Sequence, residues 1–262
     1  MVCRVFPAGW AALVARASGV ATALALTWPL GAAAQAPGQA SAAELCLSAN
    51  RHLALGASLP RTAARLKSGE ALRIVAVGSS STTGLWVVHT DGTYPEVMMR
   101  ELAALRPQAR IGVINSGRVG DTITGMVARF DRDVLAHRPE LVIWQLGTND
   151  VAWGGSATGV KDLIVSGVRV LKASGADVVL MDLQYAPMVL ASSQHTIMQM
   201  AIAEVARQER VGLFSRYALM RRSVESGLPP GALVSWDGLH NSADGYDCIG
   251  RALARAIDAV AR

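Results

Sequence analysis

Charged residues are scarce in this sequence: they make up 17% of its 262 residues, while 51% of the residues are apolar. This composition excludes an intrinsically disordered chain, because enough apolar surface is present to build a core. The length suits one large domain or two small ones. Internal repeats and a second domain boundary are both missing, which favours a single domain.

Metal-ligand patterns are missing as well. The chain has three cysteines and five histidines. They form no CxxC, HExxH or HxH pattern, so we expect no metal site. The net charge is +5, but the basic residues are scattered and form no run interleaved with aromatic residues. We therefore expect no binding to nucleic acid.

Apolar runs long enough to span a membrane are absent beyond the first segment of the chain. Arg4 and Arg16 carry the only charges before Glu44, an apolar run covers 19–28, and small residues precede Gln35. This order predicts a signal peptide, residues 1–34, that is cleaved. The protein is then periplasmic or secreted, without stable membrane insertion. An uncleaved anchor is the alternative, but the apolar run is shorter than the roughly 20 residues of a spanning helix.

Cys46 and Cys248 are the cysteines that remain after removal of the signal peptide, which contains Cys3. An even number of cysteines in an oxidising compartment predicts a disulfide between them. The bridge would join an N-terminal extension, residues 35–70, to the last helix. The alternative is two free thiols, one of them buried.

Short apolar runs alternate with amphipathic stretches from residue 72 onward. Within each run, apolar and polar residues do not alternate, so the runs predict strands that are buried on both faces. These runs are 72–77, 111–114, 141–146, 178–183 and 211–214. Helical periodicity marks four other stretches: 94–105, 160–171, 196–207 and 242–261. This order predicts an α/β fold for residues 71–262, a three-layer α/β/α sandwich around a central, mostly parallel five-stranded sheet.

Polar residues follow these runs at the carboxyl edge of the predicted sheet, where such folds bind ligands. Ser80 follows the first run, Gly120 the second and Asn149 the third, while Asp237 and His240 precede the last helix. Each has an ordinary explanation when taken alone: a serine-rich loop, a helix cap or an Asx turn. Together they supply a nucleophile, two oxyanion donors, an orienting acid and a base, which is the set that acyl transfer requires.

His240 differs from the other four histidines because a carboxylate stands three residues before it, across a glycine. A catalytic histidine needs such a carboxylate to fix its tautomer. We expect the others to be surface or packing residues: His52, His89, His137 and His195.

The combined blocks resemble the SGNH hydrolases, also called GDSL-type lipases and esterases, over residues 72–260. The family is named for its Ser, Gly, Asn and His. The blocks that contain Asn149 and His240 match its pattern in full, and Gly120 matches its oxyanion glycine.

The first block departs from the family pattern, because Ser79 stands where the family usually has an aspartate. That aspartate is a supporting residue rather than the nucleophile. The spacing selects Ser80 as the attacking serine, with Ser79 and Ser81 as less favoured alternatives.

The resemblance implies a flavodoxin-like SGNH fold and a serine esterase that needs no cofactor. Ser80 would form the acyl-enzyme, and Asp237 and His240 would supply the base. The N–H groups of Ser80 and Gly120 and the Asn149 side chain would form the oxyanion hole.

The resemblance leaves the substrate open: we expect a small ester or an acylated saccharide, with a short acyl group such as acetyl. The turn at 84–94, Trp153 and Met188 are candidates for the wall of an acyl pocket, although core packing would also explain them. Two alternatives remain, an O-acyltransferase to sugars with the same site and a non-catalytic carbohydrate-binding module.

Overall fold

The computed structural model describes residues 40–51, 53–87 and 89–260. The predicted signal peptide and its cleavage site lie outside these residues. Among the helices that the structure describes, none is both long enough and apolar enough to cross a bilayer.

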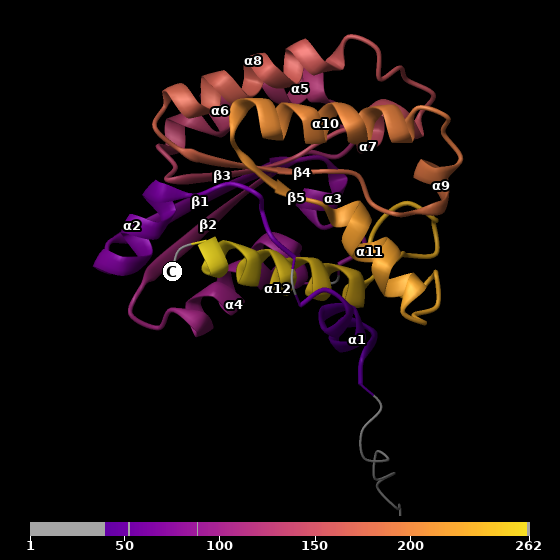
Figure 1. Cartoon of the computed structure of the whole chain (residues 1–262), viewed down its shortest axis with the longest axis horizontal. Helices are drawn as coiled ribbons and strands as arrows, with labels where there is room; N and C mark the ends of the chain where they lie inside the picture. The colour runs from indigo at the N-terminus through magenta and orange to yellow at the C-terminus, as the bar shows by residue number, and fades with distance from the viewer. Residues whose placement is uncertain (1–39, 52, 88, 261–262) are drawn as a thin grey trace, which may run out of the picture. The chain divides into compact units, whose positions relative to one another are not determined.

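A five-stranded parallel sheet forms the centre of the structure, in the strand order β2-β1-β3-β4-β5 (Figure 1). The strands are β1 (Ala71–Gly78), β2 (Arg110–Gly117), β3 (Leu141–Gln145), β4 (Asp177–Met181) and β5 (Gly212–Phe214). Every predicted strand is present, and every pair is parallel. Their carboxyl ends therefore meet at one edge of the sheet, as the α/β prediction requires.

β2 corrects one part of the prediction. The apolar run 111–114 was expected to be buried on both faces, but β2 is an edge strand that pairs with β1 alone. Ile111, Val113 and Ile114 are only half-buried, and Gly112 is exposed. An apolar run cannot distinguish a central strand from an edge strand, because position in the sheet depends on topology rather than on local pattern.

Helices cover both faces of the sheet (Figure 1). On one face, α4 (Tyr94–Leu105) packs on α12 (Ala243–Val260), and α12 also contacts α1 (Ala42–Ala49). On the other face, α8 (Val160–Ala173) packs on α10 (His195–Glu209). The remaining helices are α2 (Pro60–Ser68), α3 (Ser80–Thr83), η1 (Thr90–Gly92), α5 (Ile123–Val127), α6 (Phe130–Asp133), η2 (Leu135–His137), α7 (Thr148–Ala152), α9 (Pro187–Leu190) and α11 (Arg216–Glu225). The predicted three-layer sandwich is confirmed.

The core between the sheet and α8 is centred on Trp144 of β3, which is fully buried. Phe130 meets its ring edge-on at a centroid distance of 5.0 Å. Gly167 of α8 lies over the same ring, and a Cβ atom at this position would come within 2.6 Å of it. The absence of a side chain at Gly167 therefore lets α8 approach the sheet closely.

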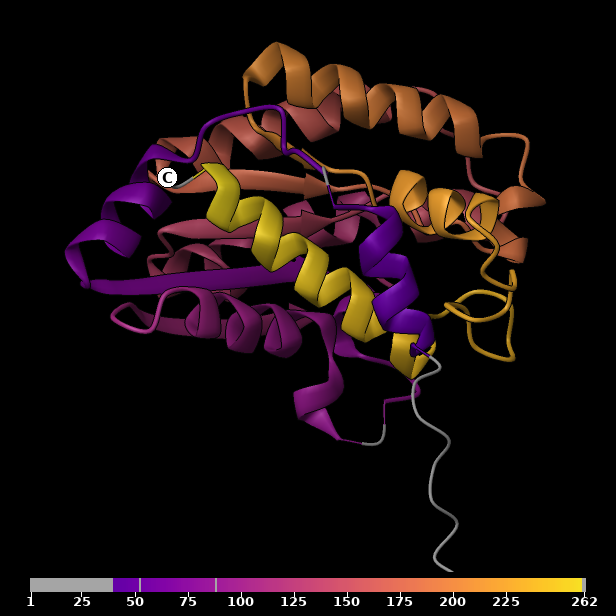
Figure 2. The ribbon, with the colours of Figure 1, turned by 60° about the horizontal axis from the view of Figure 1, so that its bottom comes forward.

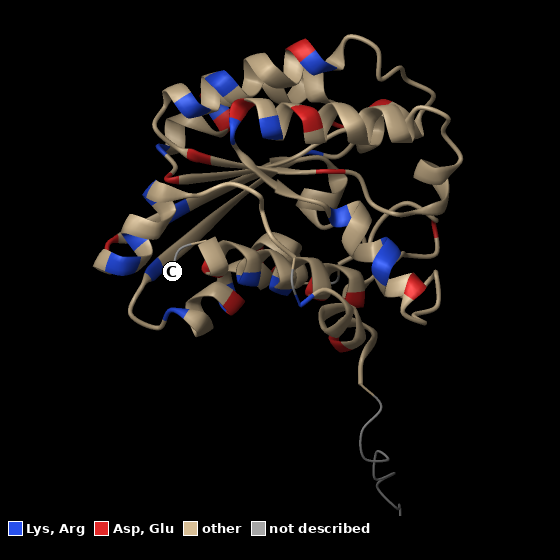
Figure 3. Cartoon of the chain, in the orientation of Figure 1, with Lys and Arg blue, Asp and Glu red and all other residues tan. Residues whose placement is uncertain are grey.

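Charged residues of both signs are interleaved on the outer helices, while the strands are almost free of them (Figure 3). Lys161 of α8 pairs with Glu204 of α10 at 2.6 Å, and Arg169 pairs with Glu209 at 2.9 Å. Exposed pairs of this kind contribute about 0–1 kcal/mol each. They favour the register of two helices whose association depends mainly on apolar packing.

The N-terminal extension is folded against the domain. A capping box formed by Ser41 and Glu44 begins α1, and Leu55 accepts a hydrogen bond from Leu213 of edge strand β5. α1 lies beside the N-terminal part of α12 (Figure 2), where the Cys46–Cys248 disulfide joins the two helices across 202 residues of sequence. The predicted disulfide is confirmed.

The disulfide should stabilise the fold, because it closes a very long loop in the unfolded chain. We expect the double variant Cys46→Ser and Cys248→Ser to lose about 2–4 kcal/mol of unfolding free energy. Urea denaturation measures this loss. After reduction with dithiothreitol, the protein with both cysteines should unfold at the same midpoint as the double variant. Equal midpoints for the oxidised protein and the double variant would contradict the expectation.

Candidate active site

Ser80 lies in the turn that follows β1, where it is the first residue of α3. The turn is tight: a Cβ atom on Gly78 would stand 2.1 Å from Thr82 Oγ1 and 2.7 Å from Gln145 Oε1. Only glycine fits there. The turn directs the Ser80 hydroxyl at His240, with Oγ and Nε2 2.7 Å apart.

The neighbouring serines have other partners. The N–H and the hydroxyl of Ser79 both donate to Gln145 Oε1, at 2.9 and 3.0 Å. Thr82 donates to the same oxygen at 3.1 Å. Ser81 is buried. Of the three serines considered from the sequence, Ser80 is thus the one that the structure places against His240.

Gln145 is a residue that the sequence analysis missed. It ends an otherwise apolar strand and is completely buried, so a polar side chain in the run 141–146 was the available signal. An uncharged Ser79 and an uncharged Gln145 can be buried together at lower cost than an aspartate.

His240 and Asp237 share one short loop before α12. Asp237 Oδ2 lies 2.6 Å from His240 Nδ1, while Oδ1 accepts the backbone N–H groups of Leu239 and His240 at 3.0 Å each. Gly238 between them has a φ of 70°, a left-handed conformation that glycine adopts freely. The loop therefore folds the carboxylate back onto the ring three residues later.

The Asp237 carboxylate is strongly acidic. Partial burial acts to raise its pKa, but hydrogen bonds from Leu239 N–H, the His240 ring, the Trp86 indole and His240 N–H outweigh it and lower the pKa to about 2. A carboxylate with a lowered pKa stays ionised until the pH falls through that value. Asp237 is thus negatively charged at neutral and mildly acidic pH, as an orienting acid must be.

Trp86 also holds Asp237, through the same carboxylate oxygen that meets the His240 ring. Its indole N–H donates to Asp237 Oδ2 at 2.7 Å. Its φ of 71° is rare for a bulky residue, and its ring lies 5.2 Å from that of Trp236. The turn 84–94 was expected near an acyl pocket. Its hydrogen bond to Asp237 was not predicted, because it joins residues 151 positions apart.

Asn149 is joined to the loop of Gly120 through the backbone carbonyl of Asp121. Gly120 has a φ of 77° and free space where a Cβ atom would stand, so its conformation rather than crowding requires glycine. The next residue, Asp121, accepts a hydrogen bond from Asn149 Nδ2 through its carbonyl at 2.9 Å. Asn149 Oδ1 in turn accepts the Trp153 indole N–H at 3.3 Å. One amide proton of Asn149 is left for a ligand.

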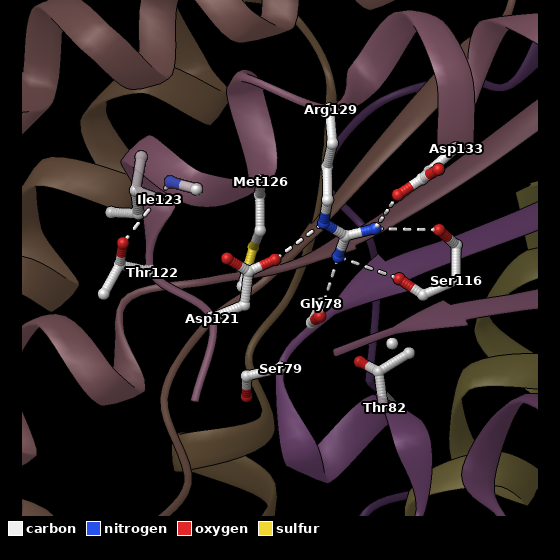
Figure 4. Close-up of polar contacts among 12 residues, drawn as sticks. Gly78, Ser79, Thr82, Ser116, Asp121, Thr122, Ile123, Met126, Arg129 and Asp133 are labelled. Atoms are coloured by element: carbon white, nitrogen blue, oxygen red, sulfur yellow. Dashed lines mark hydrogen bonds and ion pairs between the residues drawn. The ribbon is translucent and has the colours of Figure 1, made fainter. Parts of the chain in front are cut away.

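Arg129 connects these loops (Figure 4). Its guanidinium donates to Asp121 Oδ2 at 2.7 Å and to the carbonyl oxygens of Gly78 and Ser116 at 3.1 and 2.9 Å. It also reaches the Ser116 hydroxyl at 3.0 Å and Asp133 at 3.2 Å. A planar fork with five donors suits this set of acceptors. One buried cation thus fixes the end of β1, the end of β2 and the loop of Gly120.

Asp150 completes the support of this region. Its carboxylate accepts the Ile123 N–H at the start of α5, at 3.2 and 3.3 Å. Burial raises its pKa, although these backbone hydrogen bonds act in the opposite direction. The loop that contains Gly120 is therefore anchored at its far end by the residue next to Asn149.

A cleft of about 510 Å³ lies beside this region, between α7 and α9. Met188 lines it together with Val151, Gly154, Ser156, Ser192 and Gln194. Met188 N–H donates to Gly238 O at 3.1 Å, so the cleft borders the loop of Asp237 and His240. Within the described part of the chain, no three His, Cys, Asp or Glu residues are grouped to hold a metal ion.

Comparison with known proteins identifies a family and several similar proteins. The model of the non-GDSL lipase-like family matches residues 45–262. An acetylxylan esterase of Geobacillus stearothermophilus is 27% identical over 168 residues, which cover 60% of this chain and 76% of that protein.

Solved structures share the fold. A two-domain esterase (CEX) active on acetylated mannans superposes with a TM-score of 0.67 at 24% identity. The match covers 81% of this chain and 54% of that one, so the chain spans about half the length of that relative. A lipolytic protein of the G-D-S-L family from Desulfitobacterium hafniense gives a TM-score of 0.59 at 22% identity and covers 70% of this chain and 98% of its own.

Removal of the Arg129 guanidinium should destabilise the protein strongly, because it leaves the Asp121 carboxylate buried without its cation. We expect Arg129→Met to lose about 3–5 kcal/mol of unfolding free energy in urea denaturation. Arg132→Met is the matched control: this arginine lies in α6, which begins directly after Arg129, but its side chain is 76% exposed. It should change stability by about 0.5 kcal/mol or less. Similar losses in the two variants would contradict the account of Arg129.

Proposed function

The chain belongs to the non-GDSL lipase-like family and is an SGNH-like hydrolase, and on this basis we propose that it is a serine esterase that removes short acyl groups from saccharides. The observation that carries the proposal is the chain of contacts from Ser80 Oγ through the His240 ring to Asp237, at 2.7 and 2.6 Å. A hydroxyl in this arrangement can lose its proton as it attacks a carbonyl.

In the proposed reaction, His240 Nε2 accepts the Ser80 proton while Oγ forms a bond to the ester carbonyl carbon. The tetrahedral intermediate collapses, the sugar oxygen leaves with the proton from His240, and an acyl-enzyme remains on Ser80. Water then attacks the acyl group with His240 as base, which releases the carboxylic acid and restores the serine. The ionised Asp237 stabilises the imidazolium in both halves of the reaction.

The negative charge on the carbonyl oxygen would be held by three donors: the N–H groups of Ser80 and Gly120 and the second amide proton of Asn149. A donor of this kind is typically worth about 3 kcal/mol in the transition state. The contacts of Arg129 and Asp121 support the proposal, because they keep the Gly120 loop and the Asn149 amide in a fixed relation. Preorganised donors need no rearrangement as the charge develops.

Two kinds of evidence favour a small acyl group on a saccharide. Ser80 and His240 are 5% and 8% exposed, which leaves narrow access for the acyl chain. The acetylxylan esterase and the esterase active on acetylated mannans are relatives by sequence and by fold, respectively. Acetyl is the smallest acyl group that meets both conditions.

The protein should work in the periplasm or outside the cell. The Cys46–Cys248 disulfide supports this location, since such bonds persist in oxidising compartments. The basic and apolar segment at residues 1–34 supports it as a cleaved signal peptide.

Hydrolysis of p-nitrophenyl acetate by residues 35–262 tests the proposal. Ser80→Ala should reduce the rate to background, because the acyl-enzyme cannot form without the hydroxyl. Ser81→Ala is the control, since Ser81 is the adjacent buried serine, and it should retain most of the activity. Circular dichroism checks that both variants are folded.

The outcomes distinguish the alternatives. Activity that peaks with acyl chains of eight carbons or more would contradict a short acyl group. Acetyl transfer to an added oligosaccharide, without release of acetate, would indicate an O-acyltransferase. Three equally inert proteins that still bind oligosaccharides would indicate a non-catalytic carbohydrate-binding module.

A further inference from the structure

Tryptophan is distributed unevenly in the described structure. Of the four tryptophans there, Trp144 is fully buried, whereas Trp86, Trp153 and Trp236 are 52%, 67% and 81% exposed. Single exposed apolar residues are common, but aromatic rings that gather around one site mark a binding surface. The three exposed rings therefore indicate a surface that binds a ligand.

All three exposed tryptophans are attached to residues of the candidate active site. Trp236 directly precedes Asp237, and Trp86 donates its indole proton to the Asp237 carboxylate. Trp153 donates its indole proton to Asn149, on the oxyanion side. Val119, which is 60% exposed, precedes Gly120. The apolar surface thus follows the loops of the acid and of the oxyanion donors.

We propose that Trp86 and Trp236 form one sugar-binding platform and Trp153 a second, so that the enzyme binds an acylated oligosaccharide through units on both sides of the acylated one. This inference rests on the proposed function, and it goes further by naming a chain of several sugars rather than a single acylated unit as the substrate.

The chemistry of the rings favours a pyranose. The C–H groups of a pyranose form an apolar face with a slight positive charge, which matches the negative face of an aromatic ring. The indole N–H groups of Trp86 and Trp153 are already bonded, so the ring faces are what remains to bind. An extended acyl chain would instead need an enclosed apolar groove.

The cleft beside Trp153 offers polar groups to the next sugar unit. Ser156, Ser192 and Gln194 line it, and Met188 closes it toward the loop of Asp237. Hydroxyl, amide and backbone groups in a concave site provide the hydrogen bonds that sugar hydroxyls require. Ala152 and Gly154, the neighbours of Trp153 in the chain, also line the cleft, so a sugar unit beyond the second platform would meet these polar groups.

Trp236 gives the clearest test, because its indole makes no hydrogen bond among those described and is the most exposed. Trp236→Ala should lower kcat/KM on acetylated xylo-oligosaccharides at least fivefold more than on p-nitrophenyl acetate, while Trp236→Phe should recover most of the difference. Met200→Ala is the matched control, since Met200 is 68% exposed on α10, and it should leave the ratio of the two values unchanged.

Binding separates this inference from the proposed function. Xylopentaose or mannopentaose, added to the inactive Ser80→Ala protein, should quench tryptophan fluorescence to a saturating level. Addition of Trp236→Ala should weaken this binding and reduce the quench, because only the Trp153 platform stays intact. Hydrolysis of p-nitrophenyl acetate with no saccharide binding would overturn the platforms and leave the esterase intact. Two other results for Trp236→Ala would also overturn the platforms: a loss of activity on long-chain esters alone, or conversion of an oligomer to a monomer.

Discussion

The ion pair between Arg129 and Asp121 is the interaction on which the geometry of the site depends. Both groups are buried, and burial of an ion pair is costly unless every polar atom finds a partner. Arg129 meets this condition with Asp121, Ser116, Asp133 and the carbonyl of Gly78. Because Gly78 precedes the turn of Ser80 and Asp121 follows Gly120, one cation sets the distance between the proposed nucleophile and the proposed oxyanion donors.

The parallel sheet makes this arrangement possible. β1 and β2 end side by side, with Gly78 opposite Gly117. A Cβ atom on Gly117 would come within 2.2 Å of Thr83 N, so α3 can pack against β2 only because this residue is glycine. The same edge receives Asn149 after β3 and the loop of His240. Residues far apart in sequence are thereby brought to one place, although no single one of them is unusual alone.

The sequence predicts the strands, the main helices, the disulfide and the candidate site residues, because apolar periodicity and the four polar blocks are local signals. It did not reveal that β2 is an edge strand, since an apolar run has no information on its neighbours. The roles of Gln145, Arg129 and Trp86 were also missed. Gln145 and Trp86 bond to partners 66 and 151 positions away, and Arg129 reaches Gly78 across 51 positions in addition to its nearer partner Asp121. Such distant contacts leave no spacing pattern in one sequence.

The central claim is that Ser80 is the nucleophile, and covalent labelling tests it most directly. Diethyl p-nitrophenyl phosphate should react with an activated serine hydroxyl and release one equivalent of nitrophenol per protein. Fragmentation of the labelled peptide by mass spectrometry distinguishes Ser80 from its neighbours. The account predicts a diethylphosphoryl group on Ser80 and none in Ser80→Ala. A label on Ser79 or Ser81, or no label on the folded protein, would contradict it.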